Sequence, residues 1–404
     1  MTDLCVIGLG YIGLPTAALA ASTGLSVVGV DIDPQVVAAV NAGAPHIHEP
    51  GLAELVAEQV QVGRLSATTA PVPAGIFLIA VPTPFLEDKA PDLSHVVDAA
   101  EAIAAVLRPG NLVILESTSP PRTTTAIVKP VIARLTGLEG GRDYDLAYCP
   151  ERVLPGKILQ ELRANDRIVG AVTPQSAERA AAFYRRFVQG QILPTDAATA
   201  EVVKLVENAY RDVNIAFANE VSLIAAHLDI DPWQVIALAN RHPRVNILQP
   251  GPGVGGHCIG VDPWFLVDAA PDNANLIRTA RRVNEFKTQW VIDEVRRAME
   301  SLPATATIGL LGASYKPDSA DLRESPALAI AKALTAAYPG RVRVSEPHRE
   351  HLEGIDLRPL TDVLALDVLV VLVGHTAYRE LPASVWQGKP VIDTVGVVSP
   401  PPGE

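Results

Sequence analysis

The chain of 404 residues lacks several features that would each define a class of protein. No uninterrupted apolar run approaches the roughly eighteen residues that a membrane-spanning helix needs. Its three cysteines lack paired spacing, which excludes a disulfide framework and favours a reducing compartment. The formal net charge of −12 comes without a basic stripe, which argues against nucleic acid as a partner. Because no export signal opens the sequence either, we expect a soluble, cytoplasmic protein of two or three domains.

A glycine motif follows the first expected strand. The apolar run over residues 3–7 leads into Gly8-Leu-Gly10-Tyr-Ile-Gly13 and then into a helical pattern. Gly8 makes the turn, Gly10 lets a pyrophosphate lie against the backbone, and Gly13 lets helix pack on strand. The free N–H groups of the helix N-terminus then face the phosphates. Two further residues of the motif are expected cofactor contacts, Tyr11 and Ile12.

An acidic residue ends the second expected strand, residues 25–30. Asp31 follows Gly13 by eighteen residues. A carboxylate there accepts from the adenosine ribose hydroxyls and repels a 2′-phosphate. The order of strand, motif, helix, strand and acid therefore predicts NAD as the cofactor. The alternative is a glycine-rich packing turn.

Two more apolar runs, residues 77–81 and 111–115, are expected buried strands that end in threonine-containing loops. Ligands of parallel α/β sheets bind beyond the carboxyl ends of the strands. Thr83 and Thr118 are therefore placed to reach the cofactor, although each is also an ordinary residue for a helix cap.

A further strand, residues 144–148, leads into Cys-Pro-Glu151-Arg152-Val-Leu-Pro-Gly156. This rigid, charged turn makes Glu151 and Arg152 candidates to face the same crevice. Strand and helix patterns alternate to about residue 193, which predicts one doubly wound α/β domain.

A glycine-rich loop with a cysteine occupies residues 250–265. Its glycines and prolines exclude a helix or a central strand. We expect Gly255 and Gly256 to let the backbone approach a ligand closely, directly before Cys258. A thiol that faces a helix N-terminus has a lowered pKa and reacts as thiolate.

Two other interpretations of this loop stay open. A lone cysteine is often a small core residue, and His257 beside it suggests metal. Metal ligands come as spaced sets, however, and no CxxC or HxxxH accompanies this pair, so we expect no metal. Asp262 is placed to orient a water or a lysine beside Cys258.

A long helix is expected from residue 197 to about 227, and a second from 273 to about 300. At about 100° per residue, Lys204, Asn208 and Arg211 gather on one side, which is either a solvated face or a site for an anionic, hydroxylated ligand. A continuous apolar seam runs along another side, and we expect a homodimer built across it. The seam consists of Val203, Val206, Tyr210, Val213, Phe217, Val221 and Ile224.

Strand patterns return after Pro303 and predict a second, smaller α/β sheet. Its first strand, residues 307–311, leads into a loop with Lys316 and Arg323, where phosphates would bind. The expected domains are residues 1–195 (NAD-binding), 196–302 (central helices), 303–398 (a second α/β domain that could hold a nucleotide, which the resemblance given next implies to be the UDP-sugar) and a flexible tail, 399–404.

Together these motifs resemble the UDP-glucose/GDP-mannose dehydrogenase family across nearly the whole chain. The resemblance implies two Rossmann-like domains joined by a long-helix dimerisation region. It also implies oxidation of a sugar C6 alcohol to a carboxylate with two NAD⁺ and one water. The segment 240–250 is similar to the branch that acts on UDP-N-acetyl-D-mannosamine. The motifs are GLGYIGLPTAA, AVPTPF, LESTSP, AYCPERVLPG, RDVNIAFANE, NRHPRVNILQPGPGVGGHCIGVDPWF and YKPDSADLRESPA.

The resemblance also implies roles for single residues. Cys258 matches the nucleophile, Lys204 the catalytic lysine, and Asp262 the acid behind it. Glu151 and Thr118 match residues near the reacting carbon and the water. Arg323 matches a residue near the cofactor. Residues that match substrate contacts are Arg152, Val153, Asn208, Arg211, His242, Arg244, Gly255, Tyr315 and Lys316, with His242 and Arg244 expected to act across a dimer.

This pattern predicts a mechanism. Thiolate attack on the C6 aldehyde gives a thiohemiacetal whose oxyanion Lys204 and Asn208 stabilise. Oxidation then gives a thioester, which a water held by Glu151 and Asp262 hydrolyses. Other interpretations are a sister specificity for UDP-N-acetylglucosamine, UDP-glucose or GDP-mannose, a two-electron hydroxyacid dehydrogenase, and a nucleotide-sugar sensor without turnover.

Overall fold

The computed structural model describes residues 2–86, 89–256 and 258–398. The chain divides into two compact units, and each is described by itself. The first takes in the residues up to 207 together with 264–269, and the second takes in 208–263 and the residues from 270 onward.

The first unit is built on an eight-stranded sheet with the order β3-β2-β1-β4-β5-β6-β7-β8. Neighbouring strands pair in parallel, except that β7 runs antiparallel to β6. Because of this reversal, β7 begins at the edge of the sheet where β6 ends. The strands are β1 Thr2–Ile7, β2 Val27–Val30, β3 Leu65–Thr68, β4 Ala74–Ile79, β5 Leu112–Leu115, β6 Asp145–Tyr148, β7 Arg167–Ala171 and β8 Ile192–Asp196.

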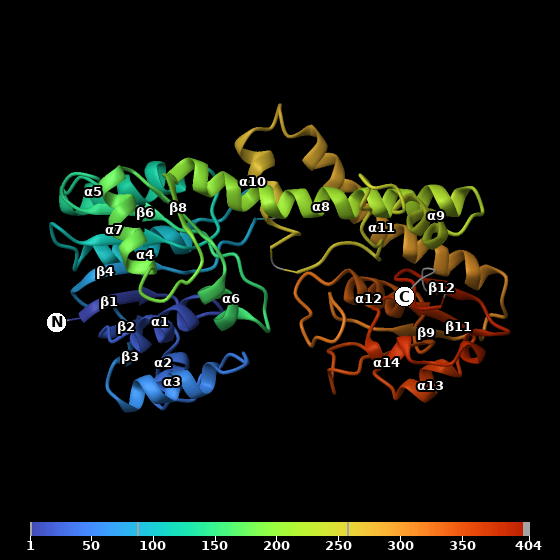
Figure 1. Cartoon of the computed structure of the whole chain (residues 1–404). Coiled ribbons are helices and arrows are strands. Elements are labelled where there is room, and N and C mark those ends of the chain that lie inside the picture. The colour runs from blue at the N-terminus through green and yellow to red at the C-terminus, as the bar shows by residue number, and fades with distance from the viewer. Residues whose placement is uncertain (1, 87–88, 257, 399–404) are drawn as a thin grey trace. The chain divides into compact units, whose positions relative to one another are not determined.

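Helices cover both faces of this sheet, as Figure 1 shows for α1 and α5. Alternate side chains of β1 enter different cores: Leu4 and Val6 pack with residues of α1, α3, α6 and α7, and Cys5 packs with residues of α4 and α5. The helices are α1 Gly13–Ser22, α2 Pro34–Asn41, α3 Leu52–Gln61, α4 Ser94–Ala104, η1 (a π-helix) Thr124–Val128, α5 Lys129–Thr136, α6 Ile158–Ala164 and α7 Pro174–Tyr184.

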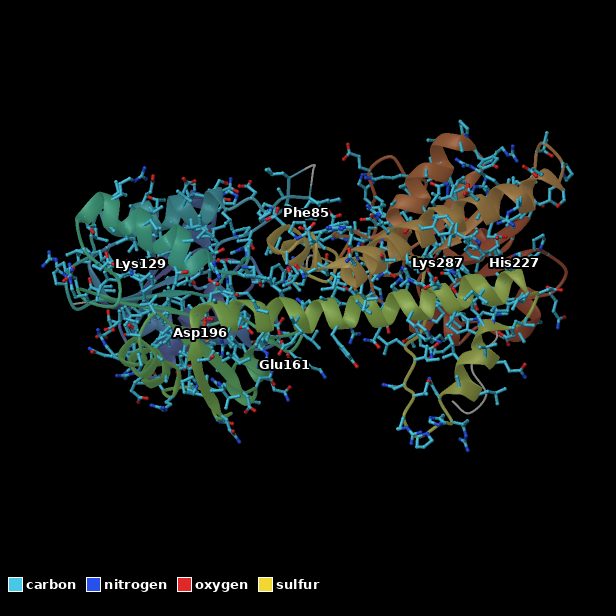
Figure 2. The ribbon with its side chains drawn as sticks, turned by 90° about the horizontal axis from the view of Figure 1, so that it is seen from above. Phe85, Lys129, Glu161, Asp196, His227 and Lys287 are labelled. Atoms are coloured by element: carbon cyan, nitrogen blue, oxygen red, sulfur yellow. The ribbon has the colours of Figure 1, made fainter. Side chains whose placement is uncertain are left out.

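One long helix, α8 (Ala197–His227), carries the chain from the first unit into the second. Figure 2 shows it as one uninterrupted helix with Asp196 just before its start and His227 at its end. Three helices follow, α9 Pro232–Ala239, α10 Asp262–Ala269 and α11 Asn275–Glu300. Within the described parts of the chain, no helix combines the length and apolarity that a membrane crossing requires.

The second unit contains a four-stranded parallel sheet with the order β10-β9-β11-β12. Its central strands are fully buried, and α11 and α12 pack on one face. The elements are β9 Ile308–Leu311, α12 Pro326–Ala337, β10 Val342–Ser345, α13 Leu360–Leu364, β11 Val368–Val371, α14 Thr376–Arg379, the 3₁₀ turn η2 Ala383–Trp386 and β12 Val391–Asp393.

The predicted fold class is confirmed: two doubly wound, Rossmann-like sheets with a long central helix. Three strands of the first sheet were not predicted, namely β3, β7 and β8. The expected strand over residues 77–81 begins earlier and ends earlier, as β4, because Val81 already belongs to the loop. The expected flexible tail, 399–404, lies outside the described residues.

Candidate active site

The glycine motif forms the turn between β1 and α1. Gly8 has φ of +94°, a left-handed conformation that favours glycine. A Cβ at Gly13 would lie 1.8 Å from the carbonyl oxygen of Gly8, so helix and turn meet at contact distance. Above Gly10, by contrast, no atom lies within 4 Å of the Cβ position. This open, concave backbone at a helix N-terminus fits a dinucleotide pyrophosphate.

Asp31 lies directly after β2 and faces this turn. One of its carboxylate oxygens accepts the Leu9 N–H at 3.0 Å, and the other accepts the Asp33 N–H at 3.0 Å. Each oxygen keeps a second lone pair for a ribose hydroxyl. Of the other predicted contacts, Tyr11 is exposed and Ile12 is the N-cap residue of α1. The predicted cofactor residues of the motif are therefore brought together around one turn.

Hydrogen bonds join the loops after β4 and β5. The Thr83 hydroxyl donates to the Thr118 carbonyl at 2.5 Å, and the Ser117 hydroxyl donates to the Val81 carbonyl at 2.7 Å. Thr83 is buried and Thr118 is half-buried. Thr83 therefore positions the Thr118 backbone, a task that neither the cap nor the cofactor interpretation foresaw.

Glu151 is buried just beyond the end of β6. Its carboxylate accepts the Arg152 N–H at 2.5 Å and a guanidinium N–H of Arg167 at 3.1 Å. Behind Arg167 lies a second buried carboxylate, Glu116, at 3.6 Å. The sequence singled out neither Arg167 nor Glu116. The position of Glu116 directly after a strand was the one available signal.

The predicted substrate residues next to Glu151 differ in their surroundings. The Arg152 guanidinium pairs with both carboxylate oxygens of Glu207 on α8, at 2.7 and 2.9 Å. Val153 is half-buried. Lys204, one turn before Glu207, is only 8% exposed, so the solvated-face interpretation is wrong for this residue.

The residues after Cys258 form a tight turn. The Cys258 carbonyl accepts the N–H groups of Val261 and Asp262 at 3.1 and 2.8 Å. Cys258 is exposed, whereas Asp262, the first residue of α10, is buried. The Asn208 amide donates to the Asp262 carboxylate at 2.5 Å. The second unit thus brings together three predicted catalytic residues. His257 lies outside the described residues.

The glycines before Cys258 do not have the expected surroundings. A Cβ at Gly255 would lie 2.6 Å from the Glu324 carbonyl oxygen and 2.8 Å from the Tyr315 Cβ. Gly256, with φ of +86°, donates its N–H to the Arg323 carbonyl at 3.0 Å. Glycine is needed at both positions on this side, because the backbone of the loop before Cys258 packs directly on the loop that contains Tyr315 and Glu324. That the backbone of Gly255 and Gly256 also lets a ligand approach closely stays a prediction.

Side chains from two helices fix the start of this loop. The Asn219 side-chain oxygen accepts the Gly251 N–H at 2.9 Å, and its amide donates to Asn284 at 2.8 Å. The Thr288 hydroxyl donates to the Pro252 carbonyl at 2.9 Å. Sequence reasoning missed these residues, because buried polar groups on a helix carry no pattern of their own.

The remaining predicted ligand contacts lie on exposed or half-buried surfaces of the second unit. Arg211, His242 and Arg244 are exposed, and Tyr315 and Lys316 are half-buried. The exposed Arg323 pairs with Asp321 of its own loop at 2.6 Å.

One group in the second unit has the composition of a metal site. Ligand atoms of Asp318, His348 and His375 lie within 4.8 Å of one another. The Nδ1 atom of His375, however, accepts the Asp318 N–H at 2.9 Å, and its Nε2 atom lies 3.3 Å from Glu346. Both ring nitrogens of His375 are therefore already hydrogen-bonded within the protein, which makes this a network that ties the loop to the sheet.

A dinucleotide-binding turn, a second parallel sheet and a cysteine turn with an acid and an amide are typical of an NAD-dependent oxidoreductase. Three family models match in order: the NAD-binding domain over residues 2–188, the central domain over 198–286 and the UDP-binding domain over 309–400. The chain belongs to the UDP-glucose/GDP-mannose dehydrogenase family and is an NAD-dependent oxidoreductase.

Several relatives match over almost their full length. A UDP-N-acetyl-D-mannosamine dehydrogenase of Salmonella typhimurium is 49% identical over 98% of this chain and 99% of its own. An NDP-N-acetyl-D-galactosaminuronic acid dehydrogenase of Ralstonia nicotianae is 50% identical over 98% and 96%. Among solved structures, the UDP-N-acetyl-mannosamine dehydrogenase of S. aureus is similar with a TM-score of 0.89 and 42% identity, over 98% of this chain and 96% of that one.

Proposed function

We propose that this chain oxidises the C6 hydroxyl of UDP-N-acetyl-D-mannosamine to a carboxylate, with two NAD⁺ and one water. The observation that carries the proposal is the exposed Cys258 in a tight turn with the buried Asp262–Asn208 pair. A two-electron alcohol dehydrogenase has no use for such a thiol. The relatives and solved structures with this activity support the choice of sugar.

The thiol supplies what a second oxidation needs. An aldehyde carbon gives up a hydride readily only after a nucleophile has made it tetrahedral. The Cys258 thiolate forms the C–S bond of a thiohemiacetal, and loss of hydride leaves a thioester. The Gly8–Gly13 turn would hold NAD, which would supply the acceptor for the two hydrides of the sugar carbon.

Other residues of this chain handle protons and charge. Lys204, or a water that it positions, takes the proton of the C6 alcohol, and Lys204 and Asn208 stabilise the thiohemiacetal oxyanion. Glu151 and Asp262 hold the water that breaks the C–S bond, and Thr118 lies beside the reacting carbon. We assign substrate contacts to Arg152, Val153, Arg211, His242, Arg244, Gly255, Tyr315 and Lys316, and cofactor contacts to Thr83, Arg323, Asp31 and the glycine motif.

The stoichiometry of the reaction tests this proposal. We expect two NADH per sugar with UDP-N-acetyl-D-mannosamine, and a kcat/KM at least tenfold lower with UDP-N-acetylglucosamine, UDP-glucose and GDP-mannose. The 50% identical Ralstonia relative favours a second candidate, an N-acetylgalactosamine-type sugar nucleotide, which belongs in the same panel. One NADH per sugar, or turnover of no sugar nucleotide, would contradict the proposal.

Replacement of Cys258 tests the nucleophile itself. Cys258→Ala should lower overall turnover by orders of magnitude, because both the second oxidation and hydrolysis depend on the thiol. Cys258→Ser should accumulate an enzyme-bound intermediate. Mass spectrometry of a rapidly quenched wild-type reaction should show a sugar adduct on the peptide that contains Cys258. If Cys258→Ala released two NADH per sugar at a near wild-type rate, the mechanism would be wrong.

We also propose a homodimer formed across α8. Tyr210, Phe217 and Ile224 lie on this helix and are 71, 55 and 53% exposed, a large apolar surface for a helix to leave in water. A partner chain would bury this stripe and bring His242 and Arg244 to the neighbouring active site. Phe217→Lys should lower the dimer fraction in sedimentation experiments. Mixed Arg244→Ala and Cys258→Ala subunits should recover part of the activity; no recovery after verified subunit exchange would exclude a shared site.

We propose the cytoplasm as the location. The buried thiols of Cys5 and Cys149 form no disulfide, which fits a reducing compartment.

A further inference from the structure

A buried guanidinium stands opposite Glu151 because of the direction of β7. Strands β6 and β7 pair antiparallel, with Tyr148 opposite Gly170. Continued by three residues, this register places Glu151 opposite Arg167, the first residue of β7. In an all-parallel sheet the first residue of the next strand would lie at the other edge. The strand reversal is therefore what delivers a cation to the carboxyl end of β6.

Arg167 is held on several sides and is only 4% exposed. One guanidinium nitrogen donates to Glu151 at 3.1 Å. The other lies 3.6 Å from the Glu116 carboxylate and 3.8 Å from the Cys149 sulfur. The guanidinium carbon stacks over the Tyr184 ring at 5.0 Å from its centre. This arrangement holds the guanidinium in one orientation, with one nitrogen on Glu151 and the other towards Glu116 and Cys149.

Glu116 closes the cluster from behind. Its carboxylate accepts the Tyr184 hydroxyl at 2.6 Å, and the Thr16 hydroxyl of α1, the helix that follows the dinucleotide turn, lies 3.5 Å from its other oxygen. Burial raises the pKa of Glu116 to about 7; the charge of Glu151 adds to this shift and that of Arg167 opposes it. Burial also raises the pKa of Tyr184 and that of Cys149, the latter to about 12, so both are neutral at pH 7.

Burial and the neighbouring charges decide when Glu116 ionises. One guanidinium faces two buried carboxylates, and ionisation of both would leave an uncompensated negative charge in a low-dielectric interior. The fully enclosed Glu116 therefore keeps its proton below about pH 7. Above that pH Glu116 loses its proton, and Arg167 divides its charge between two carboxylates.

We propose that Arg167 is a positioning residue of the reaction: it holds the Glu151 carboxylate in one orientation, while Glu116 and Tyr184 fix the guanidinium from behind. The inference rests on the proposed function, in which Glu151 holds the hydrolytic water. In that step the water oxygen bonds to the thioester carbon, Glu151 takes a water proton, and the C–S bond breaks to return the thiolate of Cys258. A Glu151 that turned away would stall this step.

Two conservative variants test the inference. Arg167→Lys keeps the charge but loses the two-nitrogen fork. We expect kcat to fall about 10–100-fold, as for other supporting residues whose loss misaligns a reactive group. The KM values for NAD⁺ and sugar should change less than about threefold. Because hydrolysis is the impaired step, an acyl adduct on the Cys258 peptide should accumulate in acid-quenched samples.

Glu116→Gln removes the buried proton-binding group and retains its size. In the wild type, log kcat should fall above an apparent pKa near 7. Glu116 ionises there, and Arg167 then divides its charge between Glu116 and Glu151. This fall should vanish in Glu116→Gln. Arg185→Lys is the matched control, because Arg185 pairs with Glu178 at 2.6 Å on the surface. It should leave kcat, the pH profile and the melting temperature unchanged.

The wild-type reaction separates the two hypotheses. If the wild type fails to oxidise any sugar nucleotide, the proposed function is wrong. If the wild type turns over but both variants keep its kcat, pH profile and adduct level, the role of Arg167 is refuted. Loss of activity that only tracks loss of folded protein, with no adduct and an unchanged pH profile, refutes it as well. If Arg167→Lys does not fold, the pH profile of Glu116→Gln decides.

Discussion

Replacing Arg281 by methionine would leave a buried carboxylate without its cation. Arg281 of α11 donates to the Asp212 carboxylate of α8 at 2.6 Å, and the Asn284 amide donates to the same oxygen at 2.8 Å. Asp212 is 0% exposed and Arg281 is 4% exposed. Burial raises the pKa of Asp212, and the charge of Arg281 limits this shift. In the Arg281→Met variant that limit is gone.

The cost should be large. Removing one partner of a buried ion pair typically destabilises a protein by about 3–5 kcal/mol. At about 2–4 °C per kcal/mol for a unit of this size, the melting temperature of the second unit should fall by about 6–20 °C. The same network holds the loop before Cys258 through Asn284 and Asn219. Activity should therefore be lost at temperatures below the melting transition.

Thermal unfolding followed by circular dichroism measures this fall in melting temperature. Its dependence on pH tests whether the unpaired Asp212 carboxylate is the cause. In Arg281→Met the folded-state pKa of Asp212 lies above its unfolded value, so the folded state binds the proton more tightly. The difference in melting temperature between the variant and the wild type should therefore shrink as pH falls from 7.5 to 5.5. Asp212→Asn added to Arg281→Met should recover part of the loss, because the amide oxygen still accepts from Asn284.

A matched control lies on the same helix. Arg296 pairs with Asp293 at 3.1 Å, but both side chains are nearly half exposed. Arg296→Met should cost less than about 1 kcal/mol. If Arg281→Met melted within 2 °C of the wild type, or if its deficit grew at low pH, the reasoning about this buried pair would be wrong.

Three further predictions concern the glycine turn, the cofactor and the thiols. Gly13→Ala should destabilise the first unit because its Cβ would collide with backbone, whereas Gly10→Ala should keep the melting temperature and weaken NAD⁺ binding in titrations. The kcat/KM of the wild type should be at least tenfold higher with NAD⁺ than with NADP⁺, and Asp31→Asn should reduce this ratio. Equal turnover of the wild type with NADP⁺ would contradict the role of Asp31 in selecting NAD. Iodoacetamide at pH 8 should label the exposed Cys258 and leave Cys149 unmodified by mass spectrometry, because burial raises the Cys149 pKa to about 12.

Some features were predictable because their causes are local. Short apolar runs bounded by glycine and proline indicated most of the strands, though not β3, β7 and β8. The spacing of Gly8, Gly10 and Gly13 predicted the turn that the structure contains. An unbroken apolar period predicted α8 to its last residue. The turn from Cys258 to Asp262 follows from five residues of the chain and their own backbone hydrogen bonds.

Tertiary structure decided the surroundings of those residues. Nothing in the sequence around Arg167 shows that β7 runs antiparallel to β6, and this direction alone puts the guanidinium beside Glu151. The packing of Gly255 on Tyr315 joins segments sixty residues apart. A contact between two residues far apart in the chain leaves no periodic pattern in the sequence. Its geometry depends on how the strands and helices that carry the two residues pack together. The sequence therefore determined which groups we propose for the chemistry, and the tertiary structure determined what holds them in place.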